Sequence, residues 1–108
     1  MVGKQMIECI HFRAAGANEQ QMVQDYLIQM AEKDGGAGSF ELRLFRDIKV
    51  EGDLWIQIYS QGPGRSFAPS PIAVTLVHEL KRHGQTHYTQ WVEMARPESL
   101  ERVQRTWV

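Results

Sequence analysis

The chain has 108 residues, 43% of them hydrophobic and 23% charged, as is ordinary for one soluble globular domain. Its 12 basic and 13 acidic residues leave a net charge of −1. This balance offers no electrostatic footprint for nucleic acid and no attraction to an anionic membrane. The only cysteine, Cys9, excludes an internal disulfide, and the start "MVGKQMIEC" lacks the apolar core of a signal peptide, so we expect a cytoplasmic protein.

The first half of the chain predicts a strand, a helix and a strand hairpin. Partial alternation of apolar residues indicates a strand at Gln5–Arg13. Apolar residues at helical spacing then predict a helix over Glu19–Lys33, with Asn18 as its N-cap. Two alternating segments, Ser39–Asp47 and 53–61, follow and are expected to pair as an antiparallel hairpin around a turn.

A second helix and a fourth strand complete the pattern. Ser70 followed by Pro71 is typical of a helix start, and Gly84 is expected to end this helix. Residues 86–95 then predict a strand. The resulting order, βαββαβ, predicts an α+β ferredoxin-like fold: a four-stranded antiparallel sheet with two helices on one face. We place this domain at residues 1–96.

Beyond Pro97 the chain is expected to form a helical tail at 97–108, which packs through Trp107. Between the third strand and the second helix lies a glycine- and proline-rich segment, Gly62–Pro69. It lacks the lysine of a phosphate-binding loop, and Pro63 removes a backbone donor, so we interpret it as a connector. A role as a flap, with Arg65 contacting an anion, remains the alternative.

The histidines do not form a metal-binding pattern. His78 and His83 are five residues apart, which turns them away from each other on a helix, and His78 is expected to face solvent. With one cysteine and no second ligand cluster, we expect no metal site. His11, on the first strand, is either an ordinary sheet residue or part of a pocket.

The face of the sheet away from the helices carries the functional clue. Period-two alternation places Leu54, Ile56 and Ile58 against the helices. The opposite face then receives Arg43, Phe45, Trp55, Gln57 and Tyr59 from the hairpin. For the fourth strand, the set His87, Thr89, Trp91 and Glu93 fits this face better than the alternate set; for the first strand the face stays open. Such an aromatic surface usually marks an interface or a ligand site.

The element order, the lengths, the strand "DLWIQIYSQ" and the helix "SPIAVTLVHELKRHG" resemble the antibiotic biosynthesis monooxygenase domain of the dimeric α+β barrel superfamily. The resemblance covers 5–95 and implies a homodimer whose sheets pair face to face. It also implies a cavity for a small aromatic or quinol-type substrate, oxidised without metal or organic cofactor. Relatives that degrade haem use an asparagine on strand one, a tryptophan at the end of strand three and a helical histidine, a pattern that this sequence lacks.

Under this interpretation the candidate pocket residues are His11, Arg43, Trp55, Gln57, Tyr59, His87 and Trp91, and the candidate dimer contacts are Phe45, Trp55, Tyr59 and Trp107. Three alternatives stay open. One is a non-enzymatic dimer of the same fold that binds or senses a small molecule. The second is an RNA-recognition-like module, which the negative net charge and the missing aromatic signature disfavour. The third is a ligand-binding regulatory domain of the ACT type.

Overall fold

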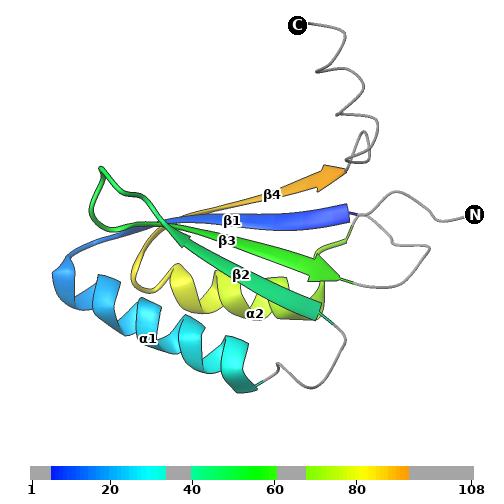
Figure 1. Ribbon diagram of the computed structural model, residues 1–108, viewed down its shortest axis with the longest axis horizontal. Helices are drawn as coiled ribbons and strands as arrows, with labels where there is room; N and C mark the ends of the chain where they lie inside the picture. Colours follow the sequence, from blue (N-terminus) through cyan, green and yellow to red (C-terminus); the bar gives the residue numbers. More distant parts are fainter. Residues whose placement is uncertain (1–5, 34–39, 61–67, 93–108) are drawn as a thin grey trace, which may run out of the picture.

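A computed structural model of the chain describes residues 6–33, 40–60 and 68–92 (Figure 1). Its elements are β1 (Met6–Ala14), α1 (Ala17–Lys33), β2 (Phe40–Arg46), β3 (Asp53–Ser60), α2 (Pro71–Leu80) and β4 (Gly84–Val92). The strands form one sheet in the order β2-β3-β1-β4, with every neighbouring pair antiparallel. This confirms the predicted ferredoxin-like fold.

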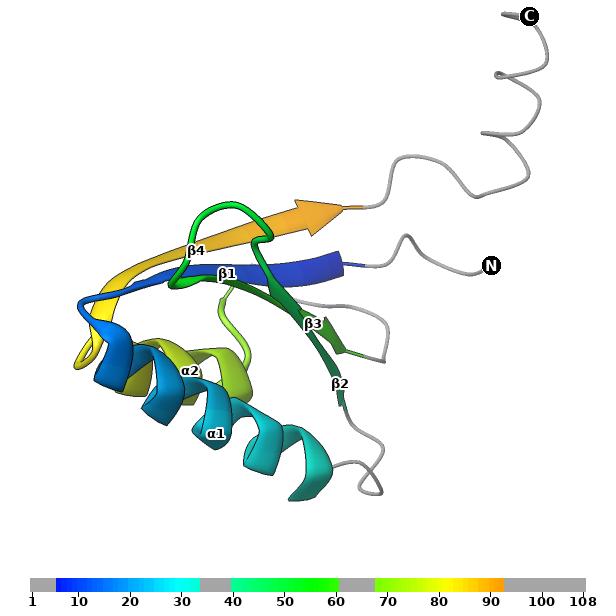
Figure 2. The same cartoon turned by 60° about the vertical axis from the view of Figure 1, so that its left-hand side comes forward.

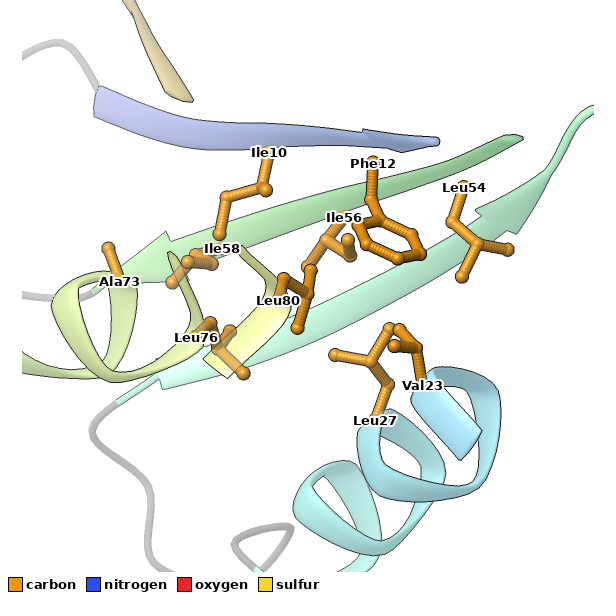
Figure 3. Packing of buried hydrophobic residues seen from close by; sticks show 10 residues of the cluster. All are labelled: Ile10, Phe12, Val23, Leu27, Leu54, Ile56, Ile58, Ala73, Leu76 and Leu80. Atoms are coloured by element: carbon orange, nitrogen blue, oxygen red, sulfur yellow. The ribbon is translucent and has the colours of Figure 1, made fainter. Parts of the chain in front are cut away.

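Both helices cover the same face of the sheet, as Figures 1 and 2 show from two directions. The core lies between these layers because apolar side chains alternate along the central strands. In Figure 3, sheet residues lie opposite residues of both helices; the labelled cluster is Ile10, Phe12, Leu54, Ile56 and Ile58 from the sheet with Val23, Leu27, Ala73, Leu76 and Leu80 from the helices. The helix-facing role predicted for the apolar positions of β3 is therefore confirmed.

The start of α1 differs from the prediction. The helix begins at Ala17, so Asn18 lies inside it and is not its N-cap. The Gly16 carbonyl accepts a hydrogen bond from the backbone N–H of Gln20 at 3.0 Å, which opens the helix earlier. The reason is the shortness of the connection, because the backbone of Ala15 is already bound to the carbonyl of His83 at 3.0 Å.

The start of α2 matches the prediction and its end does not. The Ser70 side chain accepts a hydrogen bond from the backbone N–H of Ala73 at 3.2 Å, and proline stands at the first helical position. The helix ends at Leu80, however, and Gly84 is the first residue of β4. A Cβ atom at Gly84 would lie 2.1 Å from the Arg13 carbonyl oxygen, so glycine is needed here for the close approach of β1 and β4.

Several expectations fall outside the described residues. These are the conformation of most of the segment Gly62–Pro69, the position of Glu93, and the tail at 97–108 with Trp107. Neither helix in the described ranges is long and apolar enough to cross a lipid bilayer.

Candidate functional site

The open face of the sheet, on the side away from both helices, brings all seven candidate pocket residues together. Strand register sets Trp55 and His87 on either side of His11, in one row across the sheet. The neighbouring rows hold the remaining candidates, Arg43, Gln57, Tyr59 and Trp91, and the predicted face of β4 is therefore the observed one. The face of β1 that the sequence left undecided is also resolved, because the open side carries Ile7, Cys9, His11 and Arg13.

The most constrained polar group on this face is the carboxylate of Asp53. It is only 7% exposed and accepts hydrogen bonds from Arg13 Nε at 2.8 Å and from the second guanidinium nitrogen at 3.0 Å. His11 Nε2 lies 3.2 Å from Asp53 Oδ2. The hydrogen bonds from Arg13, followed by the contact with His11, lower the pKa of Asp53 to about 2 against the opposing effect of burial. Asp53 is therefore ionised at neutral pH.

Ionisation of Asp53 determines which nitrogen of His11 carries hydrogen. An ionised carboxylate accepts hydrogen bonds only, so His11 Nε2 must be the donor in their contact. In neutral His11 the lone pair then lies on Nδ1. A histidine oriented in this way by a carboxylate is the arrangement that proteins use for a general base. The His11 ring centroid lies 5.9 Å from that of Trp55, tilted by 46°, so the base has an aromatic neighbour.

A hollow of about 370 Å³ adjoins this pair. It is lined by His11, Phe45, Arg46, Asp47, Asp53, Leu54 and Trp55. We call it the His11 hollow. A second hollow of about 220 Å³ lies between α1 and the β2–β3 hairpin and is lined by Gln24, Leu27, Ile28, Leu44, Phe45, Arg46, Leu54, Trp55 and Ile56. Trp55 lines both, and an aromatic wall with a few polar groups is what orients a flat organic ligand.

The other five candidate residues line neither of these hollows. Arg43 donates to Glu41 Oε2 at 2.8 Å and its guanidinium carbon lies 4.4 Å from the centre of the Tyr59 ring. The Tyr59 hydroxyl donates to Gln57 Oε1 at 2.9 Å, and the Trp91 indole donates to Thr89 at 2.8 Å. The three hydrogen bonds run along single strands, between residues two positions apart, and the Arg43–Tyr59 contact joins β2 to β3. Of the seven candidate pocket residues, His11 and Trp55 are the ones beside a hollow.

Sequence reasoning missed a buried acidic residue on the opposite, helix-facing side. Glu8 is only 1% exposed, and its Oε2 accepts hydrogen bonds from the Ser70 backbone N–H at 2.8 Å and from the Tyr88 hydroxyl. Burial and this hydrogen bond raise the pKa of Tyr88 to about 12. Because Ser70 is the N-cap of α2, Glu8 fixes the start of that helix on the sheet. We assign it a structural role.

A nucleophilic cysteine and a metal site both find little support in the described part of the chain. Burial raises the pKa of the Cys9 thiol, which opposes thiolate formation and nucleophilic chemistry. Within residues 6–33, 40–60 and 68–92, no three His, Cys, Asp or Glu side chains are grouped so that they could hold a metal ion.

The fold has relatives among solved structures, although no family model matches the chain and no curated protein matches its sequence. The chain has the fold of the antibiotic biosynthesis monooxygenases. One similar structure is a mutant of SnoaB, a cofactor-independent oxygenase from Streptomyces nogalater, with a TM-score of 0.65, 11% identity, and 88% of this chain and 98% of that chain covered. Another is an antibiotic biosynthesis monooxygenase, with a TM-score of 0.58, 16% identity, and coverages of 85% and 99%. At these identities the likeness concerns the fold.

Proposed function

We propose that this protein is a homodimeric, cofactor-independent monooxygenase that acts on a small aromatic or quinol-type substrate. The observation that carries the proposal is the His11–Asp53 pair beside Trp55 at the His11 hollow. The pair supplies an oriented base and the hollow supplies an aromatic wall. The fold, shared with a structure described as a cofactor-independent oxygenase, supports the same class of reaction.

In the proposed reaction His11 Nδ1 takes a proton from an acidic C–H or phenolic O–H of the substrate. The substrate anion then reduces molecular oxygen, which is the oxidant. For an activated CH₂ group, one oxygen atom becomes a new carbonyl and the other leaves as water with the two hydrogens of the CH₂ group. Ionised Asp53 stabilises the imidazolium that forms on His11, as preorganised charge does in proton transfer. Phe45 and Trp55 stack against the aromatic rings of the substrate.

The homodimer in this proposal is supported by aromatic side chains on the open face. Phe45 and Trp91 are 48% and 55% exposed in a single copy, and a second copy packed on this face would bury them. We propose a cytoplasmic setting because the single cysteine, Cys9, is free and buried, as is usual in reducing compartments.

The experiment is an oxygen-consumption assay with chelator-treated protein and a panel of quinols and polycyclic phenols. We expect the wild-type protein to consume oxygen with at least one substrate and His11→Gln to lose this activity by about 100-fold, the effect of removing a general base. His78→Gln is the matched control, because His78 is exposed on α2 in the helix layer. Binding of a panel member without any oxygen consumption would contradict the oxygenase and favour the small-molecule-binding alternative.

A further inference from the structure

Arg46, the last residue of β2, lines both the His11 hollow and the second hollow beside α1. The aromatic residues Phe45 and Trp55 are common to the same two linings. Because β2 is an edge strand of the sheet, its last residue lies where both sides of the sheet can be reached. An arginine to which the proposed proton transfer gives no role therefore stands beside the aromatic wall.

Arg46 differs from the other arginines that the structure describes. Each of these is bound to a carboxylate: Arg13 to Asp53, Arg43 to Glu41 and Arg82 to Glu79. Within residues 6–33, 40–60 and 68–92, the guanidinium of Arg46 has no hydrogen-bond or ion-pair partner. Its N–H donors are therefore available to a ligand in either hollow.

The two carboxylates that line the His11 hollow are already engaged. Asp53 accepts two hydrogen bonds from Arg13. Asp47 Oδ1 accepts hydrogen bonds from two backbone N–H groups of the following turn, both at 2.7 Å. Of the fully charged groups in this lining, Arg46 is the one without a partner in the described residues, so the lining favours an anionic group on the ligand.

The same two aspartates limit the charge of that anionic group. The backbone hydrogen bonds lower the pKa of Asp47, and the pKa of Asp53 is about 2, so both are ionised at neutral pH. They repel an anion, and they repel a carboxylate, with one negative charge, less than a phosphate group, with about two. The planar carboxylate also matches the guanidinium of Arg46, which can donate two parallel hydrogen bonds to it.

We propose that the substrate is an aromatic carboxylic acid and that Arg46 selects it by binding the carboxylate. The inference rests on the proposed function, because it concerns the substrate of that reaction. The ring of the acid packs on Phe45 and Trp55, and its carboxylate lies against Arg46 at the end of β2. Arg46 thus determines affinity and specificity, while the proton transfer remains with His11.

The test is isothermal titration calorimetry, without oxygen, of the full-length protein with a dihydroxynaphthoate and with its methyl ester, the same quinol without the charge. The wild type should bind the acid about 10- to 100-fold more tightly than the ester, the effect of hydrogen bonds between charged groups. Arg46→Gln should abolish this preference and leave binding of the ester unchanged. Arg46→Lys, which keeps the charge without the planar fork, should retain part of it. Arg82→Gln is the matched control, because Arg82 is exposed, lies beyond α2 and lines neither hollow; it should leave the preference unchanged.

The outcomes separate this inference from the proposed oxygenase. Equal binding of acid and ester by the wild type, or a preference that persists in Arg46→Gln, would overturn the role of Arg46, while oxygen consumption with an uncharged quinol would leave the oxygenase standing. A preference that depends on Arg46, without oxygen consumption, would keep Arg46 as the carboxylate-binding residue and remove the oxygenase. Failure of the wild type to bind either compound would overturn the carboxylate site. Far-ultraviolet circular dichroism confirms that the compared variants are folded.

Discussion

His11 Nε2 lies 3.2 Å from Asp53 Oδ2, and the same carboxylate is bound on its other side by the guanidinium of Arg13. Asp53 therefore links an exposed cation to an imidazole beside a hollow. The three residues come from two antiparallel strands, with Arg13 opposite Asp53 and His11 opposite Trp55 in the register of β1 and β3. The sheet thereby fixes the orientation of the proposed base.

The contacts of Asp53 with Arg13 and His11 predict how the stability of the fold changes in acid. The pKa of Asp53 is about 2 in the folded protein, whereas an aspartate in an unfolded chain titrates at about 3.9. The ionised form thus stabilises the fold above about pH 4, and this contribution is lost as the pH falls from about 4 toward about 2. Asp53→Asn should therefore lower the free energy of unfolding at pH 7 and weaken its decline between pH 4 and pH 2. Urea unfolding at pH 7, 4 and 3 measures both quantities.

The control for this measurement is Asp25→Asn, on an exposed carboxylate of α1 that accepts a hydrogen bond from Gln21 of the same helix. It should leave the acid decline unchanged. If Asp53→Asn declines as steeply as the wild type between pH 4 and pH 3, the contacts with Arg13 and His11 do not stabilise the folded protein.

We expect the Glu8 side chain, which faces the core, to contribute strongly to the stability of the fold. Glu8→Ala removes the acceptor for both the Ser70 backbone and the Tyr88 hydroxyl, and these two partly buried donors lose their partner. We expect a loss of about 3 kcal/mol in the free energy of unfolding, from hydrogen bonds to a carboxyl group in a buried site. Glu41→Ala, at an exposed residue of β2, should cost less than about 0.5 kcal/mol. Equal effects of the two substitutions in urea unfolding would refute this role.

Gly84 is expected to be intolerant of any side chain. A Cβ atom there would lie 2.1 Å from the Arg13 carbonyl oxygen, and backbone cannot move aside as a side chain can. Gly84→Ala should cost about 2 kcal/mol or more, because β1 and β4 must separate. Gly16→Ala is the matched comparison: its Cβ would meet only the flexible Glu19 carboxyl at 2.9 Å, so we expect a change within about 0.5 kcal/mol. A thermal or urea unfolding series compares them, and a Gly84→Ala protein as stable as Gly16→Ala would contradict the packing described here.

The sequence was sufficient to predict the fold because its signals are local. Alternation at Leu54, Ile56 and Ile58 identifies the helix-facing side of β3, and the structure buries all three. Ser70 and Pro71 mark the start of α2 for an equally local reason. The predicted N-cap at Asn18 was wrong because the short connection after β1 starts α1 before that residue. The predicted helix end at Gly84 was wrong because this glycine instead permits the close contact of β1 and β4.

The candidate site was predictable only in part. The alternation of side chains along a strand places Trp55 on the open face. The pairing of His11 with Asp53, in contrast, joins residues 42 positions apart and depends on the register of β1 and β3. Nothing in the pattern of either strand determines that register. Asp53 follows the turn glycine, Gly52, where an aspartate is usually interpreted as a turn residue. Arg43 lies on the predicted face, but its contacts with Glu41 and Tyr59, and its position away from the lining of the His11 hollow, depend on neighbours that the alternation does not specify.

The central claim is that His11 removes a proton from the substrate, and anaerobic absorbance spectroscopy tests it most directly. Without oxygen the reaction stops after proton transfer, so a quinol or polycyclic phenol that supports oxygen consumption should show the spectrum of its anion when mixed with wild-type protein at pH 7. The anion should be absent with His11→Gln and reduced with Asp53→Asn, which leaves His11 without its carboxylate partner. If the anion forms to the same extent with His11→Gln as with the wild type, another group is the base and the assignment of His11 is wrong.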